Sequence, residues 1–263
     1  ALLVAIQVAK AISYARELPL VGVHHLEGHM TAVYLEDDPP PFPHLALVVS
    51  GGHSSLVRVY EHGVFDELGA TRDDAAGEAF DKVARLLELG FPGGPAIQQT
   101  AQIGDPERYP LPRPLMQHDG HRYNFSFSGL KTAVLNLVRR LEDVGHNVHD
   151  PQLAADVAAS FQAAVVDVLV EKTTAAARDF GVRHVCICGG VSANAPLRNQ
   201  AQARFHSMDL PLTIPPLFLC TDNAAMIGSA AYFRWQNEPY ATENLDLEVF
   251  ANLPLAEASD SGG

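Results

Sequence analysis

The sequence has little cysteine and no long apolar run. Its 263 residues include three cysteines, an odd and sparse count that excludes a disulfide framework. We see no apolar run near the roughly 18–20 residues that a membrane span needs, and no signal peptide at the start. These absences predict a reducing, cytoplasmic setting and no membrane partner.

Positive charge is also scarce, because 18 Lys and Arg face 31 Asp and Glu, giving a net charge of −13. This balance argues against a protein that coats nucleic acid on its own, but it leaves room for a local basic patch or a partner subunit. Residues 237–263 hold six of the acids and no Lys or Arg, so residues 1–236 carry −7. The 47% apolar share otherwise indicates an ordinary globular protein.

Apolar periodicity predicts alternating strands and helices, which indicates an α/β architecture with mixed or parallel sheets. We expect helices over residues 1–17, 25–36, 75–89, 129–142, 152–180, 193–206 and 221–236. We expect strands over residues 20–23, 45–50, 54–60 and 183–188. The prolines at 39–43 predict a lobe boundary. Residues 90–128 predict a long, partly irregular insertion, and residues 237–263 a loose tail.

Histidines gather at the start of the second predicted helix, in the run Val-His-His-Leu-Glu-Gly-His. His25 and His29 are four residues apart, so on a helix they share one face, about 5–6 Å apart at Cβ. This spacing lets two imidazoles bind one Zn²⁺ or Fe²⁺. Leu26 stands where the His-Glu-x-x-His motif of zinc proteases carries its general base. The alternative is a group of surface or capping histidines.

Two glycine-containing turns each follow a predicted strand. Residues 48–52 read Val-Val-Ser-Gly-Gly, and residues 188–194 read Cys-Gly-Gly-Val-Ser-Ala-Asn. Successive backbone N–H groups in such turns can hold a phosphate or a carboxylate. The structural alternatives are a β-turn for the first segment and a helix start capped by Ser or Asn for the second.

Further candidate groups are carboxylates and a third glycine pair. Glu78 and Asp81 are three residues apart on a predicted helix, where they can accept hydrogen bonds from ribose hydroxyls or form a solvated face. Gly93-Gly94-Pro95 permits a close nucleotide approach or makes a turn. Thr221 or Asp222 caps the last helix, or else Asp222 is a hard oxygen ligand for a metal held by the two histidines.

Each segment alone is a weak signal, but their combination and order are highly specific. Together they resemble the tRNA threonylcarbamoyladenosine synthase family, once described as O-sialoglycoprotein endopeptidases. The matching stretches are His-His-Leu-Glu-Gly-His, Val-Ser-Gly-Gly-His-Ser, Asp-Asp-Ala-Ala-Gly-Glu-Ala-Phe-Asp-Lys, Pro-Gly-Gly-Pro, Phe-Ser-Phe-Ser-Gly-Leu-Lys, Gly-Gly-Val-Ser-Ala-Asn and Cys-Thr-Asp-Asn-Ala-Ala-Met.

The resemblance implies the two-lobed ASKHA fold of actin, sugar kinases and the Hsp70 ATPase, with a nucleotide in the cleft. It also implies that the family's first strands precede Ala1, so we expect an incomplete first lobe. The implied first part is the remainder of the first lobe with the metal-binding helix (1–43). The second lobe follows (44–220), with a helical insertion within it (about 73–128). A helix returning to the cleft (221–236) and an acidic tail (237–263) complete the chain.

The activity that the resemblance implies is transfer of a threonylcarbamoyl group from threonylcarbamoyl-AMP to N6 of the tRNA adenosine 3′ of the anticodon. The implied ligands of one divalent metal, Fe or Zn, are His25, His29 and Asp222. The implied contacts to the acyl-adenylate near its phosphate are Val48, Val49, Ser50, Gly51 and Gly52. The implied contacts to its nucleoside are Asp81, Gly94 and Asn194.

No general base is identified from the sequence, and the catalytic residues stay open. Residues 125–131 match a family signature to which we assign no chemistry. The resemblance also implies two protein partners in bacteria, a paralogous subunit and a small ATPase. The alternative functions are a metalloprotease, and a non-catalytic scaffold of the same fold, which we expect to lack the metal triad.

Overall fold

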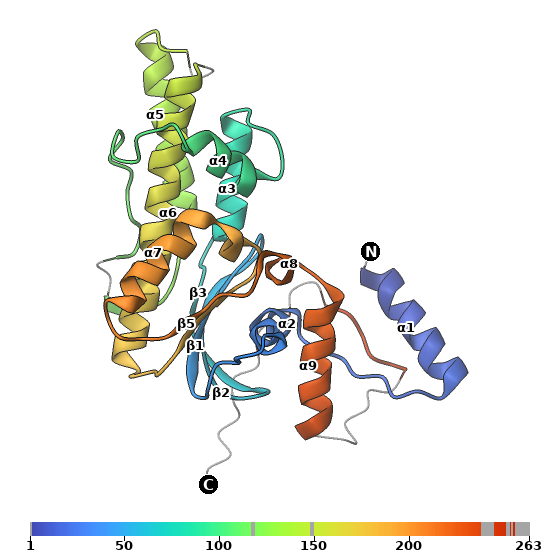
Figure 1. Ribbon diagram of the computed structural model, residues 1–263. Coiled ribbons are helices and arrows are strands. Elements are labelled where there is room, and N and C mark those ends of the chain that lie inside the picture. The colour runs from blue at the N-terminus through green and yellow to red at the C-terminus, as the bar shows by residue number, and fades with distance from the viewer. Residues whose placement is uncertain are drawn as a thin grey trace.

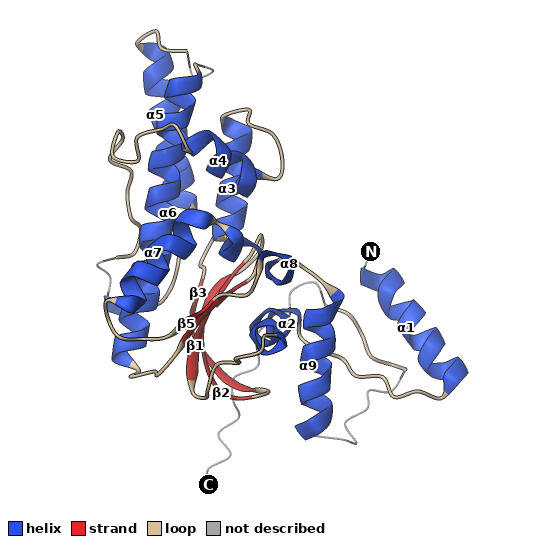
Figure 2. Cartoon of the chain, in the orientation of Figure 1, coloured by secondary structure: helices blue, strands red, loops and turns tan. Residues whose placement is uncertain are grey.

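The computed structural model describes residues 2–116, 119–147, 150–237, 245–250, 253 and 255. At its centre is a mixed five-stranded sheet in the order β3-β2-β1-β4-β5, with helices on both faces (Figures 1 and 2). The strands are β1 (His44–Val49), β2 (Ser54–Glu61), β3 (Val64–Ala70), β4 (Val185–Cys188) and β5 (Leu212–Thr213). β1 pairs antiparallel with β2 and parallel with β4, so the predicted α/β architecture is confirmed.

The helices follow the predicted pattern closely. They are α1 (Leu2–Arg16), α2 (His25–Thr31), α3 (Ala76–Leu86), α4 (Gly93–Ala101), α5 (Ser128–Asp143), α6 (Pro151–Asp179), α7 (Ala195–His206), α8 (Leu217–Cys220) and α9 (Ala224–Asn237). The described residues also form three short 3₁₀ helices, η1 (Ala32–Leu35), η2 (Asp119–His121) and η3 (Gly190–Ala193).

Some expectations were wrong. The predicted strand at residues 20–23 is irregular, because a four-residue apolar run does not form a strand without a neighbour to pair with. The insertion predicted as partly irregular is confirmed, and it contains α4, whose Pro95 lies in the first turn, where a missing N–H costs no helix bond. The strands β3 and β5 and the helix α8 were not predicted, since their apolar patterns are short or interrupted.

Each face of the sheet has its own apolar core. Successive side chains of β1 point alternately into one core and into the other. All six β1 residues are buried. Leu45 and Leu47 point into a large cluster with helices α3 to α7, while Ala46 and Val48 face α2. A strand buried on both faces reads as a continuous apolar run. The sheet therefore lies between a layer of long helices and the layer that contains α2 and α9 (Figure 1).

Among the described residues, the helix α6 is long and apolar enough to cross a membrane, contrary to our expectation that no segment approaches that length. In the structure, 78% of its 18-residue apolar window is buried inside the protein. Asp150 caps the helix by accepting hydrogen bonds from the backbone N–H groups of Gln152 and Leu153. Its apolar surface is accounted for by the core of this chain.

The two ends of the chain differ in how they pack against the rest of the protein. α1 contains no buried residue and lies apart from the sheet and the other helices (Figure 1). Most of the predicted loose tail lies outside the described residues. Leu255, however, is 6% exposed within the cluster around α2, and the carbonyl of Leu253 lies 2.8 Å from His24 Nε2. At these two positions the tail packs against the body. The division into lobes at residues 43 and 44 stays a prediction.

Acid should weaken the fold through His44, which is 1% exposed and whose Nε2 has no hydrogen-bond partner. Burial, with the nearby charges of His184 and His62, lowers the pKa of His44 to about 4. Between about pH 6.5 and pH 4 the unfolded chain therefore binds a proton that the folded chain does not, so stability falls as the pH falls through this window. We expect the stability loss between pH 7 and pH 4.5 to be about 2 kcal/mol smaller in His44→Gln. Urea unfolding at both pH values measures it, and equal losses in both proteins would contradict the prediction.

Candidate functional site

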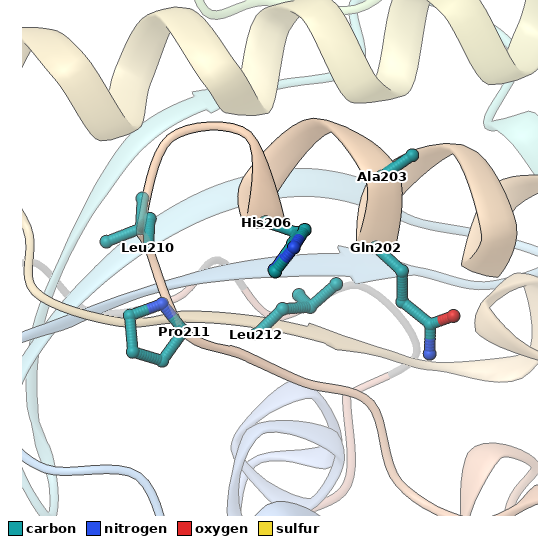
Figure 3. Close-up of a pocket in the computed structure, with 6 residues that line it drawn as sticks. All are labelled: Gln202, Ala203, His206, Leu210, Pro211 and Leu212. Carbon is teal, nitrogen blue, oxygen red and sulfur yellow. The ribbon is translucent and has the colours of Figure 1, made fainter.

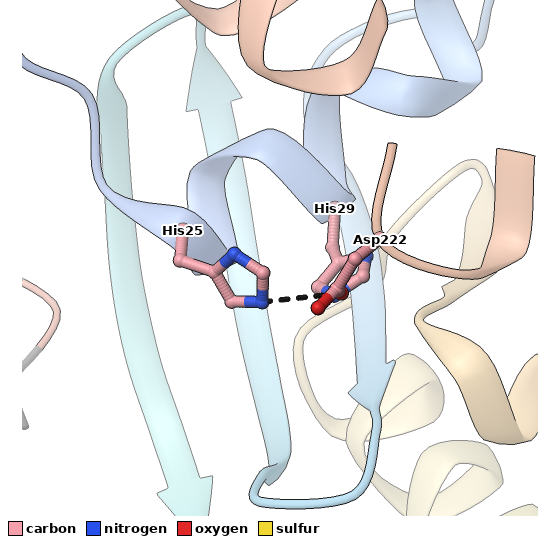
Figure 4. Close-up of side chains that lie close together, drawn as sticks. All are labelled: His25, His29 and Asp222. Atoms are coloured by element: carbon pink, nitrogen blue, oxygen red, sulfur yellow. Dashed lines mark ion pairs between the residues drawn. The ribbon is translucent and has the colours of Figure 1, made fainter. Parts of the chain in front are cut away.

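The structure brings His25, His29 and Asp222 together, as predicted from the sequence (Figure 4). One donor atom from each lies within 4.8 Å of the other two. Asp222 Oδ1 is 3.4 Å from His25 Nε2 and 3.3 Å from His29 Nε2. Two ligands that each lie about 2.1 Å from one ion, at a tetrahedral angle, are about 3.4 Å apart. Both distances from the carboxylate to an imidazole therefore match the spacing of two ligands on one metal ion.

His29 is the strongest evidence that this cluster fits a metal. Its ring is fully buried and neither ring nitrogen has a hydrogen-bond partner, although Nε2 lies 3.3 Å from Asp222 Oδ1. Burial, with the charge of His25 beside it, lowers the pKa of His29 to about 4. The imidazole is neutral at pH 7, which is the form that binds a metal. A buried ring nitrogen without a partner is costly unless something ligates it.

Packing between α2 and α9 positions the cluster. Gly28 faces α9 so closely that a Cβ there would lie 3.0 Å from Ile227 Cδ1. The hydroxyl of Ser229 on α9 donates to the backbone carbonyl of Thr31. Both histidines lie on α2, and Asp222 comes from the segment just before α9 (Figure 4). The contact between these two helices therefore sets the position of the carboxylate relative to the imidazoles.

The cap of α9 differs from our expectation, which named Thr221 or Asp222. Asn223 accepts the hydrogen bond from the backbone N–H of Met226 and also donates to the carbonyl of Thr221. Because Asn223 satisfies the helix end, the Asp222 carboxylate is free to face the two histidines.

The two predicted glycine turns lie at the same edge of the sheet. β1 and β4 are parallel neighbours, so Val49 and Cys188 end side by side. Gly189 has φ +92°, and a Cβ there would lie 2.3 Å from the carbonyl oxygen of Val49. The N–H of Gly77, at the start of α3, donates to the carbonyl of Ser50. The carboxyl edge of parallel strands, with a helix N-terminus beside it, is where α/β proteins bind phosphates.

Most residues of the first turn offer their backbone rather than their side chain. Ser50 is 9% exposed, and its N–H donates to the carbonyl of His53. Gly51 and Gly52 are exposed, with open space where a Cβ would stand. Val48 and Val49 are buried strand residues. The structure thus makes the turn accessible, while its contact to an acyl-adenylate stays a prediction.

The three predicted nucleoside contacts have structural roles or open surroundings. Asp81 accepts a hydrogen bond from the N–H of Gly93, which joins α3 to the start of α4. Gly94 next to it has open space around its Cα. Asn194 caps α7 by accepting from the N–H of Leu197, and its amide nitrogen donates to Gln162. The capping alternative is confirmed for Asn194, and the nucleoside contacts stay predictions.

The segment at residues 125–131 has a structural explanation in Asp73. The Asp73 carboxylate accepts hydrogen bonds from the backbone N–H groups of Phe127 and Ser128 and from the hydroxyls of Ser126 and Ser128. Burial works to raise the pKa of Asp73, but these hydrogen bonds outweigh it and lower the pKa below its ordinary value. Asp73 therefore holds the start of α5 against the segment that leads into α3.

Sequence reasoning did not single out His53, which lies in the turn after β1. Burial, followed by the charges of His25 and His24, lowers its pKa, and His53 in turn contributes to the low pKa of His29. His53 is thus an electrostatic neighbour of the three clustered donors. Its position directly after the Ser-Gly-Gly run is the sequence feature that could have identified His53 as a site residue.

A concavity of about 500 Å³ lies elsewhere, beside the end of α7 and β5 (Figure 3). It is lined by Gln202, Ala203, His206, Leu210, Pro211 and Leu212. None of the predicted site residues lines it.

Comparison with solved structures establishes the fold. The crystal structure of "T.kodakarensis HypF" aligns with a TM-score of 0.63 at 15% identity, covering 87% of this chain and 39% of that one. Full-length HypF in its phosphate- and nucleotide-bound form aligns with a TM-score of 0.61 at 13% identity, covering 88% and 46%. Fold and site together define an ASKHA-like α/β protein with clustered donors that fit one divalent metal.

The family follows from sequence. The model of the family described as "TsaD: tRNA N6-adenosine threonylcarbamoyltransferase" matches residues 1–229, and the chain belongs to this family. The protein of that name from Symbiobacterium thermophilum is 49% identical, over 97% of this chain and 72% of its own length. The one from Moorella thermoacetica is 48% identical over the same shares.

Proposed function

We propose that this chain transfers a threonylcarbamoyl group from threonylcarbamoyl-AMP to N6 of the adenosine 3′ of the anticodon in tRNA. The observation that carries the proposal is the family match over residues 1–229. That range contains the three clustered donors and both glycine turns. The relatives' shared name describes a transfer to N6 of adenosine in tRNA.

In this proposal His25, His29 and Asp222 hold one divalent metal, iron or zinc, since two imidazoles and a carboxylate suit either ion. Their spacing and the unpartnered ring of His29 support it. When bound, the metal supplies a Lewis acid and a template for substrate oxygens.

The chain's own residues act by positioning the reactants. Backbone N–H groups of Gly51 and Gly52, with Ser50, Val48 and Val49 beside them, hold the acyl-adenylate near its phosphate. Asp81, Gly94 and Asn194 contact the nucleoside part of the acyl-adenylate.

The N6 amine attacks the carbamoyl carbon, the bond from that carbon to the phosphate oxygen breaks, and AMP leaves with the electron pair. The N6 proton is released to solvent. AMP is a good leaving group, so orientation and charge stabilisation suffice without a covalent enzyme intermediate. We assign no general base among the described residues.

The substrate and setting follow from the same proposal. An exposed anticodon loop presents an unpaired base, which is how proteins usually reach bases in RNA. With a net charge of −13, we infer that the chain binds tRNA with help from a paralogous subunit and a small ATPase in the cytoplasm. The protease and scaffold alternatives are not favoured, because the matched family and relatives are named as transferases and Leu26 replaces the protease glutamate.

Nucleoside analysis tests the function. A bacterial strain depleted of its own enzyme is complemented with this chain, and its tRNA is digested and analysed for threonylcarbamoyladenosine by mass spectrometry. We expect the modified nucleoside to return, and to stay absent with Asp222→Ala at equal protein level. Because the chain spans about 72% of its relatives, a version carrying the relatives' additional residues is run in parallel. Absence of the nucleoside with both versions would contradict the proposal.

A further inference from the structure

The Asp222 carboxylate has to be held in place without direct support from the body of the protein. Its side chain is 77% exposed, and the described contacts of the carboxylate are those to His25 and His29. An exposed carboxylate on a connecting segment samples many positions unless the backbone on both sides is fixed. On the following side, Asn223 caps α9 and bonds to the carbonyl of Thr221. The preceding side needs a separate anchor.

Arg198, on α7, supplies that anchor. Its Nη2 donates to the carbonyl of Pro215 at 2.6 Å and lies 3.0 Å from the thiol of Cys220, two residues before Asp222. The thiol is fully buried and also donates to the carbonyl of Pro215. One guanidinium thus holds both ends of the short segment that contains α8.

The same side chain reaches the second glycine turn. Arg198 Nε donates to the carbonyl of Ser192 at 2.7 Å, within η3. Ser192 is fully buried, and Asn194 just after it caps α7. Arg198 therefore ties the turn after β4 to the segment that carries Asp222.

We propose that Arg198 is a positioning residue for the metal centre, fixing the backbone that presents Asp222 to His25 and His29 and linking it to the turn at residues 189–194. This inference rests on the proposed metal site. Arginine suits the task because its planar fork directs several N–H groups in fixed directions. A lysine ammonium, on a flexible stem, does not reproduce that fixed fork.

Metal titration tests the proposal without using activity. The full chain is stripped with a chelator and titrated with Co²⁺ alone, following both the dissociation constant and the visible absorption band, which depends on the coordination geometry. We expect Arg198→Gln to bind Co²⁺ about tenfold more weakly, the lower range for loss of a group that orients a ligand. The band should also change shape, a result that loss of general stability would not produce. The Co²⁺ dissociation constant of Arg198→Lys should lie between those of the wild type and Arg198→Gln.

Arg204→Gln is the matched control. Arg204 lies on the same helix and is ion-paired with Glu171, away from the segment before Asp222. We expect this variant to keep the wild-type Co²⁺ affinity and band. Circular dichroism and thermal unfolding verify that each variant is folded.

The outcomes are distinct. Wild-type affinity and spectrum in folded Arg198→Gln would overturn the positioning role and leave the metal centre intact. If Arg198→Gln does not fold, Arg198→Lys carries the test, and a wild-type result for it overturns the role equally. If the unmodified chain binds no Co²⁺, the proposed metal centre fails and this inference fails with it. An equal loss in Arg204→Gln would show a general effect of α7 and would also overturn the proposal.

Discussion

The double variant His25→Ala/His29→Ala is expected to retain its fold, to contain no bound metal and to lose more than about 100-fold in tRNA modification. The physical reason is that both imidazole ligands are removed, leaving an exposed carboxylate that cannot retain a divalent ion. The fold should survive, because neither ring nitrogen of the buried His29 has a hydrogen-bond partner to lose. Elemental analysis of the purified protein and mass spectrometry of tRNA nucleosides measure the two effects.

His24→Ala is the control for this experiment. His24 is adjacent in sequence, but its Nδ1 accepts from the N–H of Leu26 and so caps α2 instead of facing the cluster. Losing the cap should cost about 1 kcal/mol of stability and leave the metal content unchanged. Metal content in the double variant equal to that of the wild type would refute the ligand assignment.

Gly189→Ala is expected to reduce the free energy of unfolding by about 3 kcal/mol or more. The backbone at Gly189 has φ +92°, which an L side chain rarely adopts, and the added methyl would lie 2.3 Å from the carbonyl oxygen of Val49. The end of β4 would have to move away from the end of β1, opening the edge where both glycine turns meet. Urea denaturation of the purified variant measures the loss.

Gly190→Ala is the matched comparison, because a Cβ at Gly190 meets nothing within 4 Å. Its effect should stay within about 1 kcal/mol. Similar losses in the two variants would show that the close approach to Val49 does not limit this turn.

The sequence predicted well those features that depend on near neighbours along the chain. The four-residue spacing of His25 and His29 places them on one helix face, and their ring centroids are 4.8 Å apart in the structure. The apolar run around Val48 predicted a strand over residues 45–50, and β1 spans His44–Val49. α6 begins within a residue of its predicted start, because Asp150 and Pro151 are strong start signals.

The sequence predicted poorly those features whose stability comes from distant partners. β3 alternates less clearly and is held by its pairing with β2, which contains register shifts. The cap of α9 was assigned to Asp222 or Thr221, one or two residues before the correct Asn223. Competing polar residues near a helix start are not separated by composition, since only the backbone path decides which one reaches the free N–H groups.

By itself, the sequence determined the α/β class, the helix that carries two imidazoles, and the kinds of groups that meet at the site. Those depend on spacing and residue chemistry, which are local. Only the tertiary structure decided that Asp222 lies against the two histidines and does not cap α9, that Gly189 must pack on Val49, and that Arg198 ties the second glycine turn to the segment before Asp222. Such contacts join segments far apart along the chain. They exist because burying the two apolar faces of one sheet brings those segments together.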